Sequence, residues 1–279
     1  MPTSQEEQIA CSCLSPLSSP TSDESSSSST SVLASAGWDS NFYLWDVRTN
    51  NSNNSQKSVA HIPLPNKAYS MDVDPSTGTR LVVATAGRRN VFIDVRFGKV
   101  GMESDGEASS IIEHAQITLD RESTLKYQSR VCRFFPDGSA IAAGSIEGRV
   151  AIEFLDELGI KAPNGRKKYA FKCHRVNDTV YPVNAIAFHR TYGTFATGGC
   201  DGTVVTWDGL HKKKLSSLHK FPTSISSMCF KNDGSELAIA SSYTFEEGER
   251  DHPRDEIYIR KILGSEIAPK SMKKNSASH

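Results

Sequence analysis

The stretch AIAFHRTYGTFATGGCDGTVVTWD, residues 185–208, decides the fold. It holds three runs in which apolar and polar residues tend to alternate, separated by short segments rich in Gly, Thr and Asp. A period of two is typical of β-strands, whose successive side chains point to opposite faces of a sheet. The segment GCDG at 199–202 favours a tight reversal between the second and third runs. We therefore expect a small antiparallel sheet here.

The same pattern recurs along the chain. Four further copies are recognisable, at 11–16 with 32–47, at 70–95, at 131–154 and at 227–262. They indicate a repeat of about 40 to 45 residues that is lengthened by insertions. A short fourth run follows the third in several copies, as at 167–174 and 213–219. Each repeat thus predicts up to four antiparallel strands, called a, b, c and d in chain order.

Three segments do not fit the repeat. They are a serine-rich stretch at 18–31, a polar stretch at 49–58 and an insertion at 98–114 between strands c and d of the second copy. Their composition predicts flexible loops. We expect one repeat domain over residues 1–267, followed by a disordered polar tail over residues 268–279.

Two copies share a Trp-Asp pair at the end of strand c, each preceded at the same distance by an aspartate in the b-to-c turn. The residues are Asp39, Trp45 and Asp46 in the first copy, and Asp201, Trp207 and Asp208 in the fourth. The common offset lets each indole pack between neighbouring sheets. We expect His174, at the end of the preceding strand d, to hydrogen-bond to Asp201. These structural residues predict an all-β fold, a WD40 β-propeller.

Composition and motifs argue against several classes of function. Lys+Arg and Asp+Glu both number 32, so no global charge attracts nucleic acid or an anionic membrane. No apolar run is long enough to span a membrane, and the six cysteines lack the spacing of a zinc site. Motifs such as HExxH, GxSxG and the P-loop are missing. We expect no enzyme, catalytic residue, metal, cofactor, membrane or direct nucleic-acid partner. A hydrolase or isomerase that uses a central channel is the least favoured alternative.

Four cations of the third repeat are predicted to meet on one rim. The d-to-a and b-to-c loops share a rim because successive antiparallel strands alternate in direction. Those loops carry Arg130, Arg149, Lys172 and Arg175. Such a cluster suits a phosphate group or an acidic peptide, because guanidinium groups match phosphate oxygens. The alternative is that the four are solvated charges paired with surface carboxylates.

Trp38 lies in the b-to-c turn of the first copy, and therefore on the rim that the d-to-a and b-to-c loops form. An exposed tryptophan often marks a peptide-binding surface. The alternative is that its ring folds back over the core.

Several longer strings resemble the WD40 mitotic checkpoint proteins of the Bub (budding uninhibited by benzimidazole) group. They are ATAGRR (84–89), RESTLKYQSR (121–130), SIEGRVAIEF (145–154), KKYAFKCHR (167–175), YPVNAIAFH (181–189), GTFATGGCDG (193–202), PTSISSMCF (222–230), ELAIASSY (236–243) and HPRDEIYIR (252–260). The resemblance covers residues 67–270 and implies a seven-bladed propeller. About five blades are recognisable, and the gap falls between residues 16 and 67, which leaves open whether the ring is complete.

The resemblance also implies a function, that of a non-enzymatic adaptor of the spindle assembly checkpoint in the nucleus and, in mitosis, at kinetochores. Its rim would bind the GLEBS motif of a Bub-family checkpoint kinase and of that kinase's Mad-type or pseudokinase relative, with Trp38 as a contact. It would also bind phosphothreonine in the Met-Glu-Leu-Thr repeats of the outer-kinetochore scaffold. By matching strings, the phosphate-reading positions fall on Arg130, Arg149 and Lys172. Ubiquitin binding is left open.

An mRNA-export propeller that binds a nuclear-pore GLEBS motif is the alternative. It shares the strings EGRVAI (147–152), FKCHR (171–175) and ASSY (240–243) with this chain. The strings YPVNAIAFH, FPTSI and HPRDEIYIR favour the checkpoint group instead.

Overall fold

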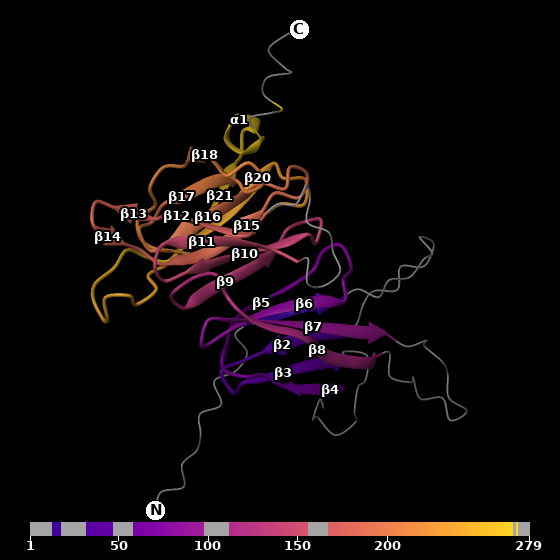
Figure 1. Cartoon of the computed structure of the whole chain (residues 1–279). Coiled ribbons are helices and arrows are strands. Elements are labelled where there is room, and N and C mark those ends of the chain that lie inside the picture. The colour runs from indigo at the N-terminus through magenta and orange to yellow at the C-terminus, as the bar shows by residue number, and fades with distance from the viewer. Residues whose placement is uncertain are drawn as a thin grey trace, which may run out of the picture. The chain divides into compact units, whose positions relative to one another are not determined.

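Antiparallel β-sheets make up almost all of the regular secondary structure of the described residues (Figure 1). The computed structural model describes residues 13–17, 32–46, 58–97, 112–155, 167–269 and 272. The chain divides into two compact units, Met1–Ser123 and Thr124–His279, which are treated separately below. The predicted all-β fold is confirmed. The serine-rich stretch 18–31 lies outside the described residues, as do nearly all of 49–58 and most of 98–114.

The first unit contains two four-stranded sheets whose strands pair in chain order. One comprises β1 (Cys13–Leu17), β2 (Val32–Ala36), β3 (Asn41–Asp46) and β4 (Ala60–Pro63), and the other comprises β5 (Ala68–Val73), β6 (Arg80–Thr85), β7 (Arg89–Phe97) and β8 (Ile112–Glu122). The two sheets share one apolar core that includes Phe42, Leu44 and Leu81.

The second unit contains two four-stranded sheets, one three-stranded sheet and a short hairpin. The first sheet comprises β9 (Ser129–Phe134), β10 (Ala140–Ser145), β11 (Arg149–Phe154) and β12 (Tyr169–Lys172). The second comprises β15 (Val183–Phe188), β16 (Phe195–Gly199), β17 (Val204–Asp208) and β18 (Lys213–Ser217). The third comprises β19 (Ile225–Phe230), β20 (Glu236–Ser241) and β21 (Glu256–Lys261), and the hairpin pairs β13 (Arg175–Val176) with β14 (Thr179–Val180).

In the described residues, four of the strands a carry a β-bulge near their start. In β5, β9, β15 and β19 one residue is skipped in the pairing with strand b: Tyr69, Arg130, Asn184 and Ser226 respectively. A bulge turns the side chain of the extra residue away from the regular alternation of the strand. It therefore decides where the Arg130 side chain is presented at the edge of its sheet.

Two boundaries differ from those expected. β8 begins at Ile112, so the end of the predicted insertion at 98–114 is strand. At the other end of the chain, the helix α1 (Gly264–Ile267) is followed by buried Ala268 and Pro269, which the sequence had assigned to the disordered tail. The hydroxyl of Thr206 donates to the carbonyl of Glu266 at 2.6 Å, and this bond ties α1 to β17. Among the described residues, no helix is long and apolar enough to cross a membrane.

Candidate functional site

A network of buried polar side chains holds the b-to-c turn between β16 and β17. His174 Nδ1 lies 3.0 Å from Asp201 Oδ1, as the sequence predicted, and its Nε2 lies 2.8 Å from Oγ1 of Thr197. The indole N–H of Trp207 donates to the same Thr197 hydroxyl at 2.9 Å. Burial raises the pKa of Asp201, but the hydrogen bond and charge of His174, together with two hydrogen bonds from Thr203, outweigh this effect and hold that pKa below its usual value. The sequence did not single out Thr197, because a threonine inside a strand carries no distinctive signal.

The first unit repeats part of this arrangement. Trp45 Nε1 donates to Ser35 Oγ at 2.8 Å, so Ser35 takes the place of Thr197. Asp39 accepts the backbone N–H of Asn41 at 3.1 Å and closes the turn between β2 and β3. The aspartates that follow the tryptophans, Asp46 and Asp208, are buried. These contacts support the turn and the strand ends, which is a structural role.

Trp207 also joins two sheets of the second unit. Its ring lies against Phe171 of β12 with 4.6 Å between the ring centroids. This is the packing between neighbouring sheets that the sequence predicted for the Trp-Asp tryptophans. The contact fixes β12, and with it the cations that β12 and its following loop carry.

The four predicted cations lie at one end of the β9–β12 sheet. β9 and β11 begin at this end, and β10 and β12 finish there. Arg149 and Lys172 are direct partners across the β11–β12 pair. Arg130 occupies the bulge near the start of β9, and Arg175 begins the β13–β14 hairpin just after β12. The backbone pairing therefore brings these positions together.

One carboxylate lies within this cluster. Arg149 Nε is 3.2 Å from Glu147 Oε2, and the Arg149 side chain is 35% exposed. Arg175 Nη2 donates to the backbone carbonyl of Glu147 at 3.0 Å, and the Lys126 N–H donates to Glu147 Oε1 at 3.3 Å. Lys172 is exposed. Among the described residues, Arg149 is paired with Glu147, whereas Lys172 and Arg175 are exposed, so positive charge remains on a surface that solvent reaches.

Arg130 also acts on the neighbouring sheet. Burial raises the pKa of the Cys200 thiol, and the positive charge of Arg130 acts in the opposite direction. Cys200 follows β16, next to the turn that holds Asp201. Arg130 thus lies near enough to Cys200 for its charge to act on this thiol, as does the opposing charge of Glu246.

Trp38 stands in the turn between β2 and β3 of the first unit and is 44% exposed, so its ring does not cover the core. Its ring meets Tyr69 edge-on at 6.1 Å, and Lys67 Nζ lies 5.7 Å from its centroid. The sequence did not single out these two neighbours. Tyr69 reaches the Trp38 ring because it occupies the bulge of β5, and the position of a bulge depends on hydrogen-bond register. Together they form an aromatic and cationic patch suited to a peptide.

The described cysteines and acidic residues do not gather into a metal centre. No group of three or more His, Cys, Asp or Glu side chains in the described part of the chain could hold a metal ion. Cys132, Cys173 and Cys200 are buried free thiols, and Cys229 is an exposed one. Burial raises the pKa of Cys173 strongly, which disfavours the reactive thiolate.

Comparison with known proteins identifies the repeat and the relatives. The family model "WD domain, G-beta repeat" matches residues 165–208. The mitotic checkpoint protein bub3 of Dictyostelium discoideum is 46% identical over 86% of this chain and 66% of its own length. The mitotic checkpoint protein BUB3.1 of Arabidopsis thaliana is 45% identical over 85% of this chain and 64% of its own length.

The poly(A)+ RNA export protein of Schizosaccharomyces pombe is more distant, at 33% identity over 87% of this chain and 62% of its own length. The chain spans a little under two thirds of the length of the curated relatives it matches. The sequence identity to these checkpoint proteins agrees with the repeated antiparallel sheets. It also agrees with the hydrogen-bond network around Thr197, which joins His174 to Trp207. The chain belongs to the Bub3 family of WD40 β-propeller proteins.

Proposed function

We propose that this protein is a non-enzymatic adaptor of the spindle assembly checkpoint, which acts in the nucleus and, during mitosis, at kinetochores. The similarity to relatives named as mitotic checkpoint proteins supports this role. The cation cluster supports binding of a negatively charged partner as the means by which it acts.

The observation that carries the proposal is the meeting of Arg130, Arg149 and Lys172 at one end of a single sheet. A phosphothreonine carries a charge of about −1.5 to −2 and three strong acceptor oxygens at neutral pH. The guanidinium of Arg149 and the ammonium of Lys172 would donate to these oxygens, and Arg149 would exchange its ion pair with Glu147 for the phosphate. Arg175 holds the Glu147 turn in place. The ligand is phosphothreonine in a Met-Glu-Leu-Thr repeat of the outer-kinetochore scaffold.

Charge reversal tests this site. In the double variant Arg149→Glu with Lys172→Glu, the affinity for a fluorescent Met-Glu-Leu-phosphothreonine peptide should fall about 100-fold, because two charge-assisted hydrogen bonds are replaced by repulsion. Fluorescence anisotropy measures the affinity. Lys220→Glu, an exposed lysine of the same unit, is the matched control and should bind as the wild type does. Unchanged affinity in the double variant would contradict the proposed phosphate site.

The GLEBS motif of a Bub-family checkpoint kinase, and of its Mad-type or pseudokinase relative, is the second proposed ligand, with Trp38 as a contact. Truncation of an exposed interface tryptophan usually costs more than about 1 kcal/mol of binding free energy. Trp38→Ala should therefore weaken binding of a GLEBS peptide about tenfold. Ile117→Ala removes another exposed apolar side chain of the first unit and should leave the affinity unchanged. Equal affinities of the two variants for the GLEBS peptide would show that Trp38 is not part of the binding site.

The relative named as an RNA export protein favours one alternative, an mRNA-export adaptor that binds a nucleoporin GLEBS motif. Affinity purification from mitotic extract separates the two functions. Recovery of a checkpoint kinase supports the checkpoint adaptor, whereas recovery of a nucleoporin together with RNA supports the export adaptor.

A further inference from the structure

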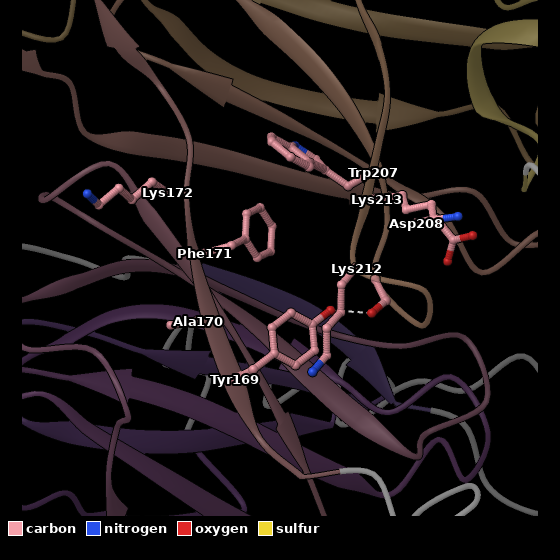
Figure 2. Close-up of a pocket in the computed structure, with 9 residues that line it drawn as sticks. Tyr169, Ala170, Phe171, Lys172, Trp207, Asp208, Lys212 and Lys213 are labelled. Carbon is pink, nitrogen blue, oxygen red and sulfur yellow. Dashed lines mark hydrogen bonds between the residues drawn. The ribbon is translucent and has the colours of Figure 1, made fainter.

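A pocket of about 350 Å³ lies in the second unit, between strand β12 and the hairpin that joins β17 to β18 (Figure 2). Its apolar walls are the rings of Tyr169, Phe171 and Trp207. Its polar lining includes Asp208, Lys212 and Lys213. Lys172 also lines the pocket and is the one lining residue that the functions proposed above use.

The aromatic walls are fixed by their neighbours. Tyr169 and Phe171 are alternate residues of β12 and so share one face of the strand, and Figure 2 shows the Phe171 ring directed toward Trp207. The hydroxyl of Tyr169 donates to the carbonyl of Gly209 in the hairpin. The indole N–H of Trp207 is held by Thr197. The apolar part of the pocket is therefore formed before any ligand arrives.

The charge in the pocket is positive. Asp208 is buried, and both of its oxygens are occupied, Oδ1 by the His211 N–H at 3.0 Å and Oδ2 by His211 Nδ1 at 2.7 Å. In the part of the chain that the structure describes, no carboxylate lies within ion-pair distance of Lys212 or Lys213, and both lysines are exposed. The two ammonium groups are thus available to an anionic partner.

Lys212 has an unusual backbone conformation and a ring contact. Its φ is 56°, in the left-handed region that glycine or asparagine adopts at lower cost. Its Nζ lies 4.5 Å from the centroid of the Tyr169 ring, which places the charge at the mouth of the pocket. The ring contact therefore holds the charge of Lys212 beside the aromatic walls of the pocket.

We propose that this pocket binds an acidic peptide segment that carries an apolar side chain. The apolar side chain would enter between Phe171 and Trp207, and flanking carboxylates would pair with Lys212 and Lys213. The site shares Lys172 with the phosphate site, but its aromatic walls and the two lysines Lys212 and Lys213 lie outside the phosphate site, as Arg149 lies outside this pocket. It also needs no phosphate on its ligand.

Single-stranded RNA is the other polymer that joins negative charge to flat apolar groups. Bases bind by stacking on open aromatic faces. Here Lys212 covers one face of Tyr169, and Phe171 lies against Trp207, so neither ring offers an unobstructed stacking platform. The observations therefore favour the peptide.

The test uses the full chain and a fluorescent peptide, Glu-Asp-Glu-Leu-Phe-Glu-Asp-Glu, followed by anisotropy at low salt. We expect saturable binding that weakens about tenfold when Leu-Phe is replaced by Ala-Ala, and about tenfold in the double variant Lys212→Glu with Lys213→Glu. Lys220→Glu is the matched control for surface charge, and Arg149→Glu is the control for the phosphate site. Both controls should bind the peptide as the wild type does.

Four results would overturn the proposal, the last of which concerns the phosphate site. The first is the absence of saturable binding by the wild type. The second is an affinity that the Lys212 and Lys213 reversals leave unchanged. The third is displacement of the peptide by a ten-nucleotide oligouridine that shows the same dependence on the two lysines, which would assign the pocket to RNA. Loss of peptide binding in Arg149→Glu would show that the phosphate site, rather than this pocket, holds the peptide.

Discussion

At the scale of single residues, His189 shows how packing controls protonation. Its ring stacks on Tyr192 at 4.6 Å and meets Phe230 edge-on at 5.4 Å. Gly234 lies so close that an added Cβ would fall 2.1 Å from the imidazole Nε2. The Tyr192 N–H is directed at Nδ1 from 3.3 Å, which suits a neutral ring that accepts at Nδ1. Burial lowers the pKa of His189, so the surroundings favour the neutral form.

A pH dependence of stability follows. Because the pKa of His189 is lower in the folded than in the unfolded protein, its contribution is present above about pH 6.5 and is lost as pH falls through the folded pKa. The free energy of unfolding should therefore drop between about pH 7.5 and about pH 5.5. The drop should be smaller in His189→Gln than in the wild type or in the exposed-site control His219→Gln. Urea denaturation followed by circular dichroism measures it, and equal drops in all three proteins would contradict the assignment.

At the scale of elements, the sequence predicted strands better than it predicted how strands meet. The alternation of apolar and polar residues, together with the turn residues between the runs, located every strand from β5 to β7 and from β9 to β12. Local side-chain chemistry determines both of these features. The bulge at Arg130 was not foreseen, since it is a property of hydrogen-bond register rather than composition. The four cations were selected correctly as neighbours at one sheet end, but the ion pair of Arg149 with Glu147 depends on side-chain conformation, which spacing does not determine.

The polar network between β12 and β17 makes a measurable contribution to stability. Thr197→Val keeps the shape of the side chain but leaves the Trp207 N–H without its acceptor and His174 Nε2 without its partner. We expect a loss of about 2 kcal/mol in the free energy of unfolding, because buried polar groups become unsatisfied. The exposed-site control Thr179→Val should change it by less than about 0.5 kcal/mol. A loss no larger than that of the control would show that the network is not a source of stability.

Close packing of β16 on β19 predicts that enlarging Gly198 lowers the stability of the protein. A Cβ at Gly198 would fall 2.4 Å from Cγ2 and 2.8 Å from Cβ of Ile225. Gly198→Ala should therefore destabilise the protein by about 1 to 3 kcal/mol through overpacking. Gly193→Ala is not a fair control, because Gly193 has a positive φ of 62°. Gly264→Ala, where an added Cβ meets nothing within 4 Å, is suitable and should be nearly neutral. Thermal unfolding that ranks the two variants in the opposite order would refute this packing argument.

At the scale of the whole molecule, 32 basic and 32 acidic residues cancel, so no long-range field attracts an anionic ligand. Any preference for a phosphorylated partner must come from a local concentration of charge, such as Arg130, Arg149 and Lys172 at one sheet end. Binding should then weaken several-fold when the salt concentration rises from about 0.05 M to about 0.3 M, because added ions screen exposed charges. Salt-independent binding would indicate an apolar contact instead.

Isothermal titration of the wild-type chain with two Met-Glu-Leu-Thr peptides that differ only in the phosphate tests the central claim most directly. If the cation cluster binds phosphothreonine, the phosphorylated peptide should bind about 100-fold more tightly than its unphosphorylated twin. Equal affinities for the two peptides would contradict the account.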